Sequence, residues 1–329
     1  MFQYRHSKVD HEKLITQIEL IQLNLQYLSY QQIDKVKWDD CINNSPNRVI
    51  YAESIYLDYM CEHWDAIILD DYKAVMPIPW KKKMGIKYIY QPPFTQQGGI
   101  YSSLKLPEEI IESFIIKASQ HFKFATFTLN YSNLLNLKKA SPFEYKLRNN
   151  FILPMNENYI QNSNSLSNDF RRKLKKSTSF NLKYSESENI KLAIHSFKKN
   201  YQDRNLNLKS KDYSNFEELC KYYKSKNRLI IRKVDDDKNL LSIVLLLKDN
   251  NRIYNLLPCL FDVGKEKFAN YFLYNCLIEE FSENNLILDF EGSEIKGVAN
   301  FYSKITSMNQ PYPFIKFNNL PKLVKLIKK

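Results

Sequence analysis

The sequence predicts an α/β protein of two similar domains, each with a mixed, mostly antiparallel sheet flanked by helices. Segments with apolar residues at helical spacing alternate with strand-like segments along most of the 329 residues. Both halves contain helices, a meander of strands, another helix and a closing strand in the same order. The repeat spans roughly 160 residues, which is the size of one domain. A hydrophobic fraction of 44% and an aromatic fraction of 14% supply material for large cores.

Composition sets the expected domain boundaries. Residues 1–23 are a lead-in whose order the sequence leaves open, and the first domain is expected over residues 24–155. Residues 156–169, NENYIQNSNSLSND, are rich in Asn and Ser, which is typical of a connecting segment. The second domain is expected over residues 170–329.

Local patterns predict the elements of the first domain. A helix is expected where Pro107 suits the first turn and the acidic Glu108 and Glu109 suit the positive end of the helix dipole. Alternating apolar residues and Asp, Pro or Gly turns mark the strands. In chain order we predict a helix in 49–64, two strands in 65–83, a strand and a Gly-Gly turn in 86–101, a helix over 106–122, and strands in 123–133 and 145–155.

The second domain shows the same alternation. It begins with a basic segment, FRRKLKK, and has a meander of three strands whose turns are acidic. We predict a basic helix and a strand in 170–187, helices in 189–205 and 213–226, the meander in 228–261, a helix over 265–284, a strand from 286, a short helix starting near 296, and a strand in 311–318.

The charge of the chain leaves two interpretations open. Lys and Arg outnumber Asp and Glu by 48 to 36, a formal net charge of +12. Only nine of the 48 basic residues are Arg, the side chain that binds phosphates with two parallel hydrogen bonds. A solvated lysine surface is therefore favoured over a dedicated groove for a polyanion.

The Cys and His residues indicate a reduced, metal-free protein. The five cysteines are widely spaced and form no C-x-x-C pair, and the five histidines show no ligand spacing. The N-terminal residues lack the apolar core of a signal peptide, and no apolar run is long enough to span a membrane. We therefore expect a cytoplasmic protein without a metal or an integral membrane span.

Glycine is scarce, with six in the whole chain, so no Walker loop or G-x-G-x-x-G fingerprint is present. Three other blocks are informative together. They are YIYQPPFTQQGGIYS at 88–102, DFRRKLKKS at 169–177, and LILDFEGSEIKGVANFYSKI at 286–305 with the helix before it. In order and spacing they resemble the FemAB-type acyltransferases, a tandem GNAT group that includes peptidoglycan aminoacyl transferases. The resemblance runs from about residue 25 to residue 320.

This resemblance implies two GNAT-like domains that meet at a cleft, an acyl donor and an amine acceptor. In acetyl-CoA-using GNAT proteins a glycine-rich loop presents N–H groups to the pyrophosphate. The corresponding segment here, FDVGKEKFA, has one glycine, Gly264, and the resemblance assigns Gly264, Lys265 and Lys267 to donor binding. The donor stays open between an acyl-CoA and an aminoacyl-tRNA. The peptidoglycan branch has Lys after the terminal Phe, whereas Tyr302 follows Phe301 here, so the peptidoglycan substrate is not carried over.

The stretch LDFEGSEIKGVANFY holds the candidate catalytic residues. Asp289 and Glu291 are two apart on a predicted strand, so they would share a face and one carboxyl pKa would rise, which suits a general base. The alternative is a capping or ion-pairing Asp289 and a solvated Glu291. Tyr302 is a candidate proton donor to the leaving group, or else a core aromatic. Ser293 is a candidate substrate contact, or else a helix N-cap.

The remaining candidates would bind substrate. Arg171 and Arg172 in the basic helix could contact phosphates of a nucleotide-linked, lipid-linked or tRNA substrate, or simply be solvated. Gln91, Gln96 and Gln97 flank a glycine turn, where their amides could bind a carbonyl or sugar hydroxyl, or satisfy local backbone groups. Phe301 is expected to contact substrate beside Tyr302.

Two functions from different classes follow. The first is an N-acyltransferase that moves an acyl or aminoacyl group from a CoA thioester or an aminoacyl-tRNA to an amine, such as a cell-envelope or sugar-linked amine. The alternative is a catalytically silent GNAT-fold module that binds a polyanionic ligand. The acceptor, the donor and the oligomeric state are not determined by the sequence.

Overall fold

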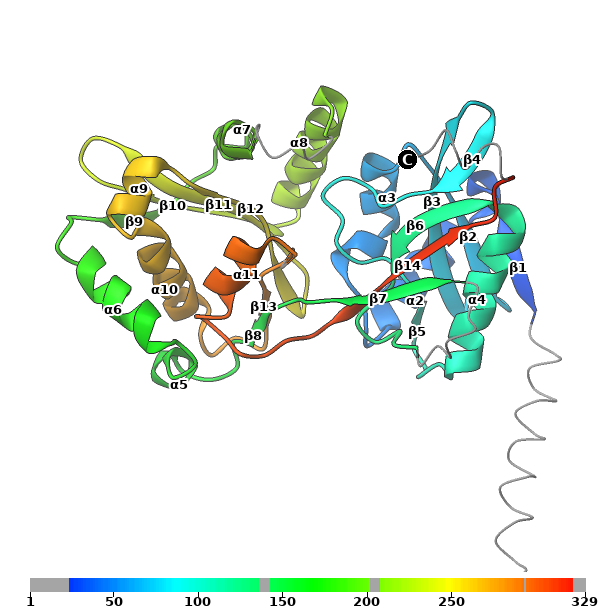
Figure 1. Ribbon diagram of the computed structural model, residues 1–329, viewed down its shortest axis with the longest axis horizontal. Coiled ribbons are helices and arrows are strands. Elements are labelled where there is room, and N and C mark those ends of the chain that lie inside the picture. The colour runs from blue at the N-terminus through cyan, green and yellow to red at the C-terminus, as the bar shows by residue number, and fades with distance from the viewer. Residues whose placement is uncertain (1–23, 136–142, 202–207, 293, 322–329) are drawn as a thin grey trace, which may run out of the picture.

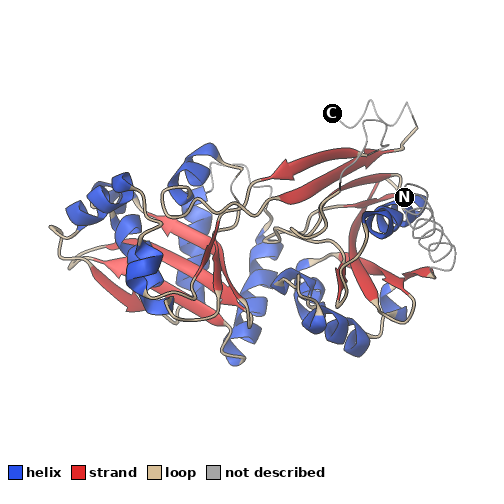
Figure 2. Ribbon diagram, turned by 90° about the horizontal axis from the view of Figure 1, so that it is seen from below, coloured by secondary structure: helices blue, strands red, loops and turns tan. Residues whose placement is uncertain are grey.

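The computed structural model describes residues 24–135, 143–201, 208–292 and 294–321. It consists of two lobes, each with one sheet, joined side by side (Figures 1 and 2). Most strand pairs are antiparallel, and the parallel pairs are β4 with β6 and β12 with β13. The predicted fold class, two mostly antiparallel sheets flanked by helices, is confirmed.

The first lobe contains an eight-stranded sheet in the order β1-β2-β3-β4-β6-β14-β7, with β5 paired to β3. Helix α4 covers one face of this sheet, and α2 and α3 lie toward the other lobe (Figure 1). The strands are β1 (Leu25–Leu28), β2 (His63–Leu69), β3 (Ala74–Lys83), β4 (Ile86–Ile89), β5 (Tyr101–Ser102), β6 (Phe124–Thr128), β7 (Glu144–Arg148) and β14 (Tyr312–Asn318). The helices are α2 (Lys35–Asn44), α3 (Ser54–Met60), α4 (Glu108–His121) and the short 3-10 helices Tyr30–Gln32 and Ile50–Ala52.

The second lobe contains a six-stranded sheet in the order β8-β13-β12-β11-β10-β9. Helices α7 and α8 cover one face, and α6 and α10 cover the other (Figure 1). Its strands are β8 (Ile152–Pro154), β9 (Lys183–Glu186), β10 (Leu229–Asp235), β11 (Leu240–Lys248), β12 (Arg252–Leu260) and β13 (Ile287–Asp289). Its helices are α5 (Tyr159–Ser163), α6 (Asn168–Ser177), α7 (Ile190–Tyr201), α8 (Ser210–Ser225), α9 (Asp262–Glu266), α10 (Ala269–Phe281) and α11 (Lys296–Tyr302).

The central strand β11 explains why its sequence is a nearly continuous apolar run. Ile243 and Leu245 pack into the core that faces α7 and α8, whereas Val244 and Leu246 pack into the core that faces α10. A strand that is covered on both faces needs apolar side chains at consecutive positions. The run LLSIVLLLK therefore forms the middle of the sheet.

The two sheets do not follow the boundary expected at residues 156–169. Strand β14, near the end of the chain, lies between β6 and β7 of the first sheet, with Phe314 opposite Thr128 and Ile315 opposite Tyr145. Strand β8, from the expected first domain, pairs with β13 of the second sheet. The chain thus crosses between the lobes twice, once after β7 and once before β14.

One hydrophobic core connects the lobes. It contains residues of α2, α3 and β2 from the first lobe together with residues of α7, α8 and β12 from the second. Aromatic contacts bridge the lobes: Tyr51 packs against Tyr254 at 5.5 Å, and Phe94 stacks on Phe216 at 4.4 Å between ring centroids. Because aromatic side chains bury large areas, this shared core holds the two sheets together.

Four predicted elements differ from those observed, and one is the strand expected in 145–155, which forms β7 of the first sheet and β8 of the second. The helix expected over 265–284 is two helices, α9 and α10, because Phe268 between them has a left-handed backbone with φ of 58°. The helix expected in 49–64 is reduced to the helical turns before Cys61, since His63 already begins β2. The connection expected at 156–169 contains helix α5. Within the described part of the chain, no helix is long and apolar enough to cross a membrane.

Candidate functional site

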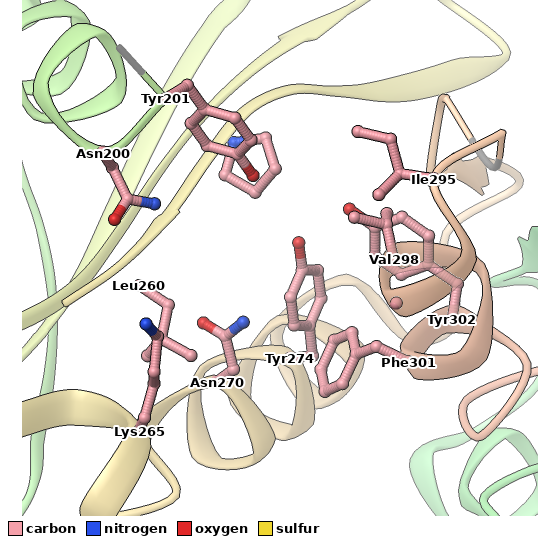
Figure 3. Close-up of a pocket in the computed structure, with 12 residues that line it drawn as sticks. Asn200, Tyr201, Leu260, Lys265, Asn270, Tyr274, Ile295, Val298, Phe301 and Tyr302 are labelled. Carbon is pink, nitrogen blue, oxygen red and sulfur yellow. The ribbon is translucent and has the colours of Figure 1, made fainter. Parts of the chain in front are cut away.

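The second lobe contains a cavity of about 660 Å³ between the end of β12, the start of α10 and helix α11 (Figure 3). Tyr274 points its hydroxyl into this space (Figure 3). Polar side chains from α7, α9 and α10 and apolar side chains from α11 form the walls. The lining residues are Asn200, Tyr201, Pro258, Leu260, Lys265, Asn270, Tyr274, Ile295, Gly297, Val298, Phe301 and Tyr302.

The cavity lies where β12 and β13 separate. The two parallel strands pair from Arg252 opposite Ile287 to Tyr254 opposite Asp289, and β13 ends there. Strand β12 continues along β11 to Leu260, with an irregular register at Leu245 and Leu246. Asn255 is therefore the first residue of β12 beyond the paired segment, at the fork between the strands.

Asn255 links two tyrosines at this fork. Its side chain is buried, and its amide Nδ2 donates to the hydroxyl of Tyr274 at 2.9 Å and to the hydroxyl of Tyr302 at 2.8 Å. The Tyr274 hydroxyl donates back to Asn255 Oδ1 at 3.1 Å. Because both tyrosines also line the cavity, this network presents hydroxyl groups to any ligand inside it.

Tyr302 is held in its protonated form. Burial, followed by the nearby Tyr274 and Tyr201, raises the pKa of its hydroxyl well above the ordinary value. Its ring packs against Phe290 at 4.8 Å and against Phe301 at 5.8 Å between centroids. Its oxygen accepts the hydrogen bond from Asn255, and its hydroxyl also interacts with the hydroxyl of Tyr274. The predicted substrate contact Phe301 lines the same cavity.

Asp289 lies away from this cavity, in an ion pair. Its carboxylate accepts a hydrogen bond from the guanidinium of Arg252, and the two side chains are 0% and 3% exposed. Arg252 also donates to Gln310 Oε1 at 3.0 Å and lies 5.0 Å from the ring centre of Tyr131. The ion-pairing alternative for Asp289 is therefore the arrangement observed.

Glu291 is in a different environment. The predicted shared face does not arise from strand alternation, because β13 ends at Asp289 and Glu291 has a left-handed backbone with φ of 53°. The two carboxyls nevertheless interact electrostatically. The pKa of Glu291 is raised well above its ordinary value, first by burial and then by the charge of Asp289. The Glu291 amide donates to Asp289 Oδ1 at 3.1 Å.

Glu291 faces the first lobe rather than the cavity. Its carboxyl lies beside the buried hydroxyl of Tyr51. After burial, Glu291 raises the pKa of the Tyr51 hydroxyl, and Tyr51 in turn lowers the pKa of Glu291. The neighbouring Phe290 packs its ring on that of Tyr302. Of these two predicted catalytic residues, Tyr302 lines the cavity and Glu291 does not. Ser293 lies outside the described residues.

The three predicted donor-binding residues have different roles. Lys265 lines the cavity and pairs with Asp262 at 2.7 Å. Lys267 forms an ion pair with Asp236 in the turn between β10 and β11, and it does not line the cavity. Gly264 packs α9 closely on β11, because an added Cβ would lie 2.1 Å from the carbonyl oxygen of Leu241.

The predicted substrate-binding arginines lie on the exposed face of α6. Arg171 donates to the carbonyls of Ser163 and Asn164, and Arg172 pairs with Asp169 at 2.7 Å. Neither side chain lines the cavity. Helix α6 packs against α10, so the arginines project from the opposite side of that helix pair.

The three glutamines are bound within the first lobe. Gln91 Nε2 donates to the carbonyl of Thr95, and its Oε1 accepts from Thr128. Gln96 donates to Asn150 Oδ1 at 3.1 Å, and Gln97 is 1% exposed and donates to Gln96 at 2.9 Å. These amides satisfy internal groups, which was the alternative to substrate binding.

Several cavity residues were missed by the sequence analysis. Asn255 and Tyr274 lie in segments correctly predicted as a strand and a helix, but neither segment stands out in composition. Asn270 and Tyr274 are four residues apart on α10, a spacing that puts them on one helix face. This spacing was a usable signal, although with 23 tyrosines in the chain it is not specific.

No family model matches the sequence, and no curated protein matches it. Solved structures with a tandem GNAT architecture do match in three dimensions. The tandem GNAT protein from the clavulanic acid biosynthesis pathway matches at 8% identity with a TM-score of 0.51, covering 91% of this chain and 100% of that one. A conserved Bacteroides thetaiotaomicron protein of unknown function matches at 7% identity, 86% and 97% coverage, and a TM-score of 0.55. The fold is therefore a tandem GNAT fold.

The fold is also similar to that of FemX. The FemX crystal structure matches with a TM-score of 0.63 at 14% identity and covers 92% of this chain and 100% of that one. At the level of the fold, the predicted resemblance to the FemAB-type acyltransferases is confirmed.

Proposed function

We propose that this protein is an acyltransferase that moves an acyl or aminoacyl group from a CoA thioester or an aminoacyl-tRNA to an amine. The observation that carries the proposal is the cavity at the fork of β12 and β13, with the hydroxyls of Tyr274 and Tyr302 held by Asn255. A space of about 660 Å³ is large enough for the acyl end of such a donor. The FemX-like tandem GNAT fold supports the same class of reaction.

Tyr302 is proposed to stabilise charge in the transition state. When an amine nitrogen attacks the carbonyl carbon of the donor, negative charge develops on the carbonyl oxygen. A preorganised donor in a dry site stabilises that charge. Tyr302 supplies an O–H whose position is set by Asn255, and it then gives its proton to the leaving thiolate or ribose oxygen.

Glu291 is proposed to take up the amine proton. As the C–N bond forms and the C–S or C–O bond breaks, the attacking nitrogen loses one proton. A carboxyl with a raised pKa is a stronger base once ionised. Because Glu291 faces the first lobe, the acceptor amine would approach from the junction of the lobes, and Asp289 would act through its charge on Glu291. A cell-envelope or sugar-linked amine is the proposed acceptor class.

Lys265 is proposed to contact the donor at the mouth of the cavity. Its ammonium group is paired with the exposed Asp262 but lines the cavity, where it suits a phosphate of CoA or of the tRNA acceptor end, whereas Lys267 pairs with Asp236 and does not line the cavity.

The proposal is tested by thermal shift and product assays with acetyl-CoA, longer acyl-CoAs and charged tRNA, each with a panel of amines. An acyl-CoA that raises the melting temperature and yields an N-acyl product supports a CoA donor. Stabilisation and product with charged tRNA alone support an aminoacyl donor. Salt-sensitive binding of tRNA or an anionic glycan without any product would instead identify a silent binding module.

A further inference from the structure

The hairpin formed by β3 and β4 carries an unusual concentration of positive charge. Its sequence from 80 to 87, WKKKMGIK, contains four lysines and no acidic residue. Met84 and Gly85 form the turn, with φ of 50° and 82°. Lys82, Lys83 and Lys87 are exposed, and Met84 at the tip is 78% exposed.

Two of these lysines oppose one another. Lys82 of β3 lies directly across from Lys87 of β4 in the antiparallel register. Like charges in directly opposite positions destabilise a strand pair. This hairpin therefore keeps a charge arrangement that costs stability in the free protein, and an anionic partner would relieve that cost.

The base of the hairpin is held firmly by an aromatic stack. The Lys87 ammonium lies 4.1 Å from the ring centre of Trp80. The ring of His63 also stacks on that of Trp80, with 4.3 Å between the ring centres. Lys81 pairs with Glu62 at 3.8 Å and lies over Tyr90, so its charge is partly neutralised. The exposed charge is concentrated at Lys82, Lys83 and Lys87.

One more exposed lysine lies at the same end of the strands in the first sheet. Strand β4 runs parallel to β6, with Ile89 opposite Ala125, so the exposed Lys123 just before β6 lies toward the hairpin turn. The Asn319 amide donates to the Lys123 carbonyl at 2.7 Å, so the chain leaves β14 at this edge (Figure 1).

We propose that the β3–β4 hairpin docks this protein on an anionic lipid bilayer surface. Lysines near such a surface each strengthen binding by electrostatic attraction, by about fivefold per residue. The exposed Met84 between them would enter the boundary of headgroups and acyl chains, which an apolar tip flanked by lysines favours. This docking is independent of the proposed acyl transfer, since the hairpin lies in the other lobe from the cavity.

A bilayer fits the hairpin better than a nucleic acid does. The hairpin uses lysine throughout and contains no arginine, the side chain suited to bidentate phosphate contacts. It also exposes a large apolar side chain at its most prominent point. Phosphates alone would account for the lysines but would give Met84 no favourable partner.

Sedimentation with lipid vesicles tests the proposal, using phosphatidylcholine alone and phosphatidylcholine mixed with phosphatidylglycerol. The full-length protein should bind the anionic vesicles and not the neutral ones. The variant Lys82→Gln/Lys83→Gln should lose roughly twenty-fold in vesicle affinity, and Met84→Ser should lose a smaller factor. The control variant Lys191→Gln/Lys238→Gln, exposed lysines of the second lobe, should bind as the wild type does.

Thermal melting at low salt gives a second measurement. Lys82→Gln should melt no lower than the wild type, because the substitution removes the repulsion with Lys87. Equal loss of vesicle binding in the hairpin and control variants would overturn the proposal. So would vesicle binding that is unaffected by the hairpin variants. Binding of duplex RNA that depends on Lys82 and Lys83, with no vesicle binding, would assign the hairpin to nucleic acid instead.

Discussion

Asp289 at the end of β13 forms a buried ion pair with Arg252 at the start of the parallel strand β12. Arg252 lies opposite Ile287 in the register, so its side chain reaches two residues along the partner strand to meet Asp289. The pair lies beside the point where the two strands separate to open the cavity. It therefore joins the strands at the fork. Burial is the main cause of the raised pKa of Glu291, and the negative charge of Asp289 adds to it.

Breaking this ion pair should lower the stability of the folded protein. Asp289→Asn leaves the Arg252 charge buried without a counter-ion, and we expect the free energy of unfolding to fall by about 3–5 kcal/mol. Urea denaturation followed by circular dichroism measures this change. The matched control is Asp237→Asn, which removes an exposed pair with Lys183 and should leave the free energy of unfolding nearly unchanged. Equal effects of the two substitutions would contradict the structural role of Asp289.

Tyr302→Phe should impair catalysis more than folding. The substitution removes the hydroxyl held by Asn255 but keeps the ring on Phe290, so we expect kcat to fall about 10²–10³-fold with little change in KM. Steady-state kinetics with whichever donor gives product in the assays proposed above measure both values. Tyr271→Phe is the control, because the Tyr271 hydroxyl lies outside the Asn255 network and accepts from Lys173. An unchanged kcat in Tyr302→Phe would remove Tyr302 from the mechanism.

Substituting alanine for two of the glycines should affect the free energy of unfolding in different ways. Gly264→Ala brings a methyl group within 2.1 Å of the Leu241 carbonyl oxygen, so α9 must move and the free energy of unfolding should fall by at least about 1–3 kcal/mol. Gly297→Ala meets no atom within 4 Å and lies in helix α11, where Ala is the better helix former. It should leave stability unchanged or raise it by up to about 1 kcal/mol. Chemical denaturation of both variants is sufficient, and a destabilised Gly297→Ala would contradict the open environment of that residue.

Glu291 should make stability fall with rising pH. Its pKa in the folded state lies well above 4.5, so between pH 4.5 and the raised pKa the folded protein binds more protons than the unfolded chain. The free energy of unfolding therefore decreases as pH rises through this window. Glu291→Gln removes the titrating carboxyl, so the free energy of unfolding of the variant should not show this decrease with pH. The variant should therefore gain stability relative to the wild type as the pH approaches neutrality. Identical pH dependence in both proteins would mean that Glu291 is not held protonated.

The pH dependence of activity tests the proposed base separately. If ionised Glu291 accepts the amine proton, kcat/KM should rise with pH as Glu291 loses its own proton. In Glu291→Gln this limb should disappear and the remaining rate should be low. A limb that persists in the variant would come from ionisation of the amine substrate, and the role of Glu291 as base would be abandoned.

Local sequence signals predicted much of the fold. The helix over 106–122 is observed as α4 within two residues at each end, because its proline and acidic first turn act locally. The predicted meander is observed as β10, β11 and β12, because acidic turns separate strongly apolar strands. The helix break at Phe268 was missed, since a left-handed backbone at a phenylalanine has no local sequence signal.

The sequence by itself determined the fold class and most of the order of the elements. These depend on periodicity, turn residues and short motifs, which act over a few residues. The tertiary structure decided which partners the candidate catalytic residues meet: Arg252 for Asp289, Tyr51 for Glu291 and Asn255 for Tyr302. It also placed β14 in the first sheet. In the order given, these partners are 37, 240 and 47 residues apart in the sequence, so the packing of strands and lobes decides whether they meet. The residue pattern of a strand shows that the strand pairs, but it does not show which strand is its partner.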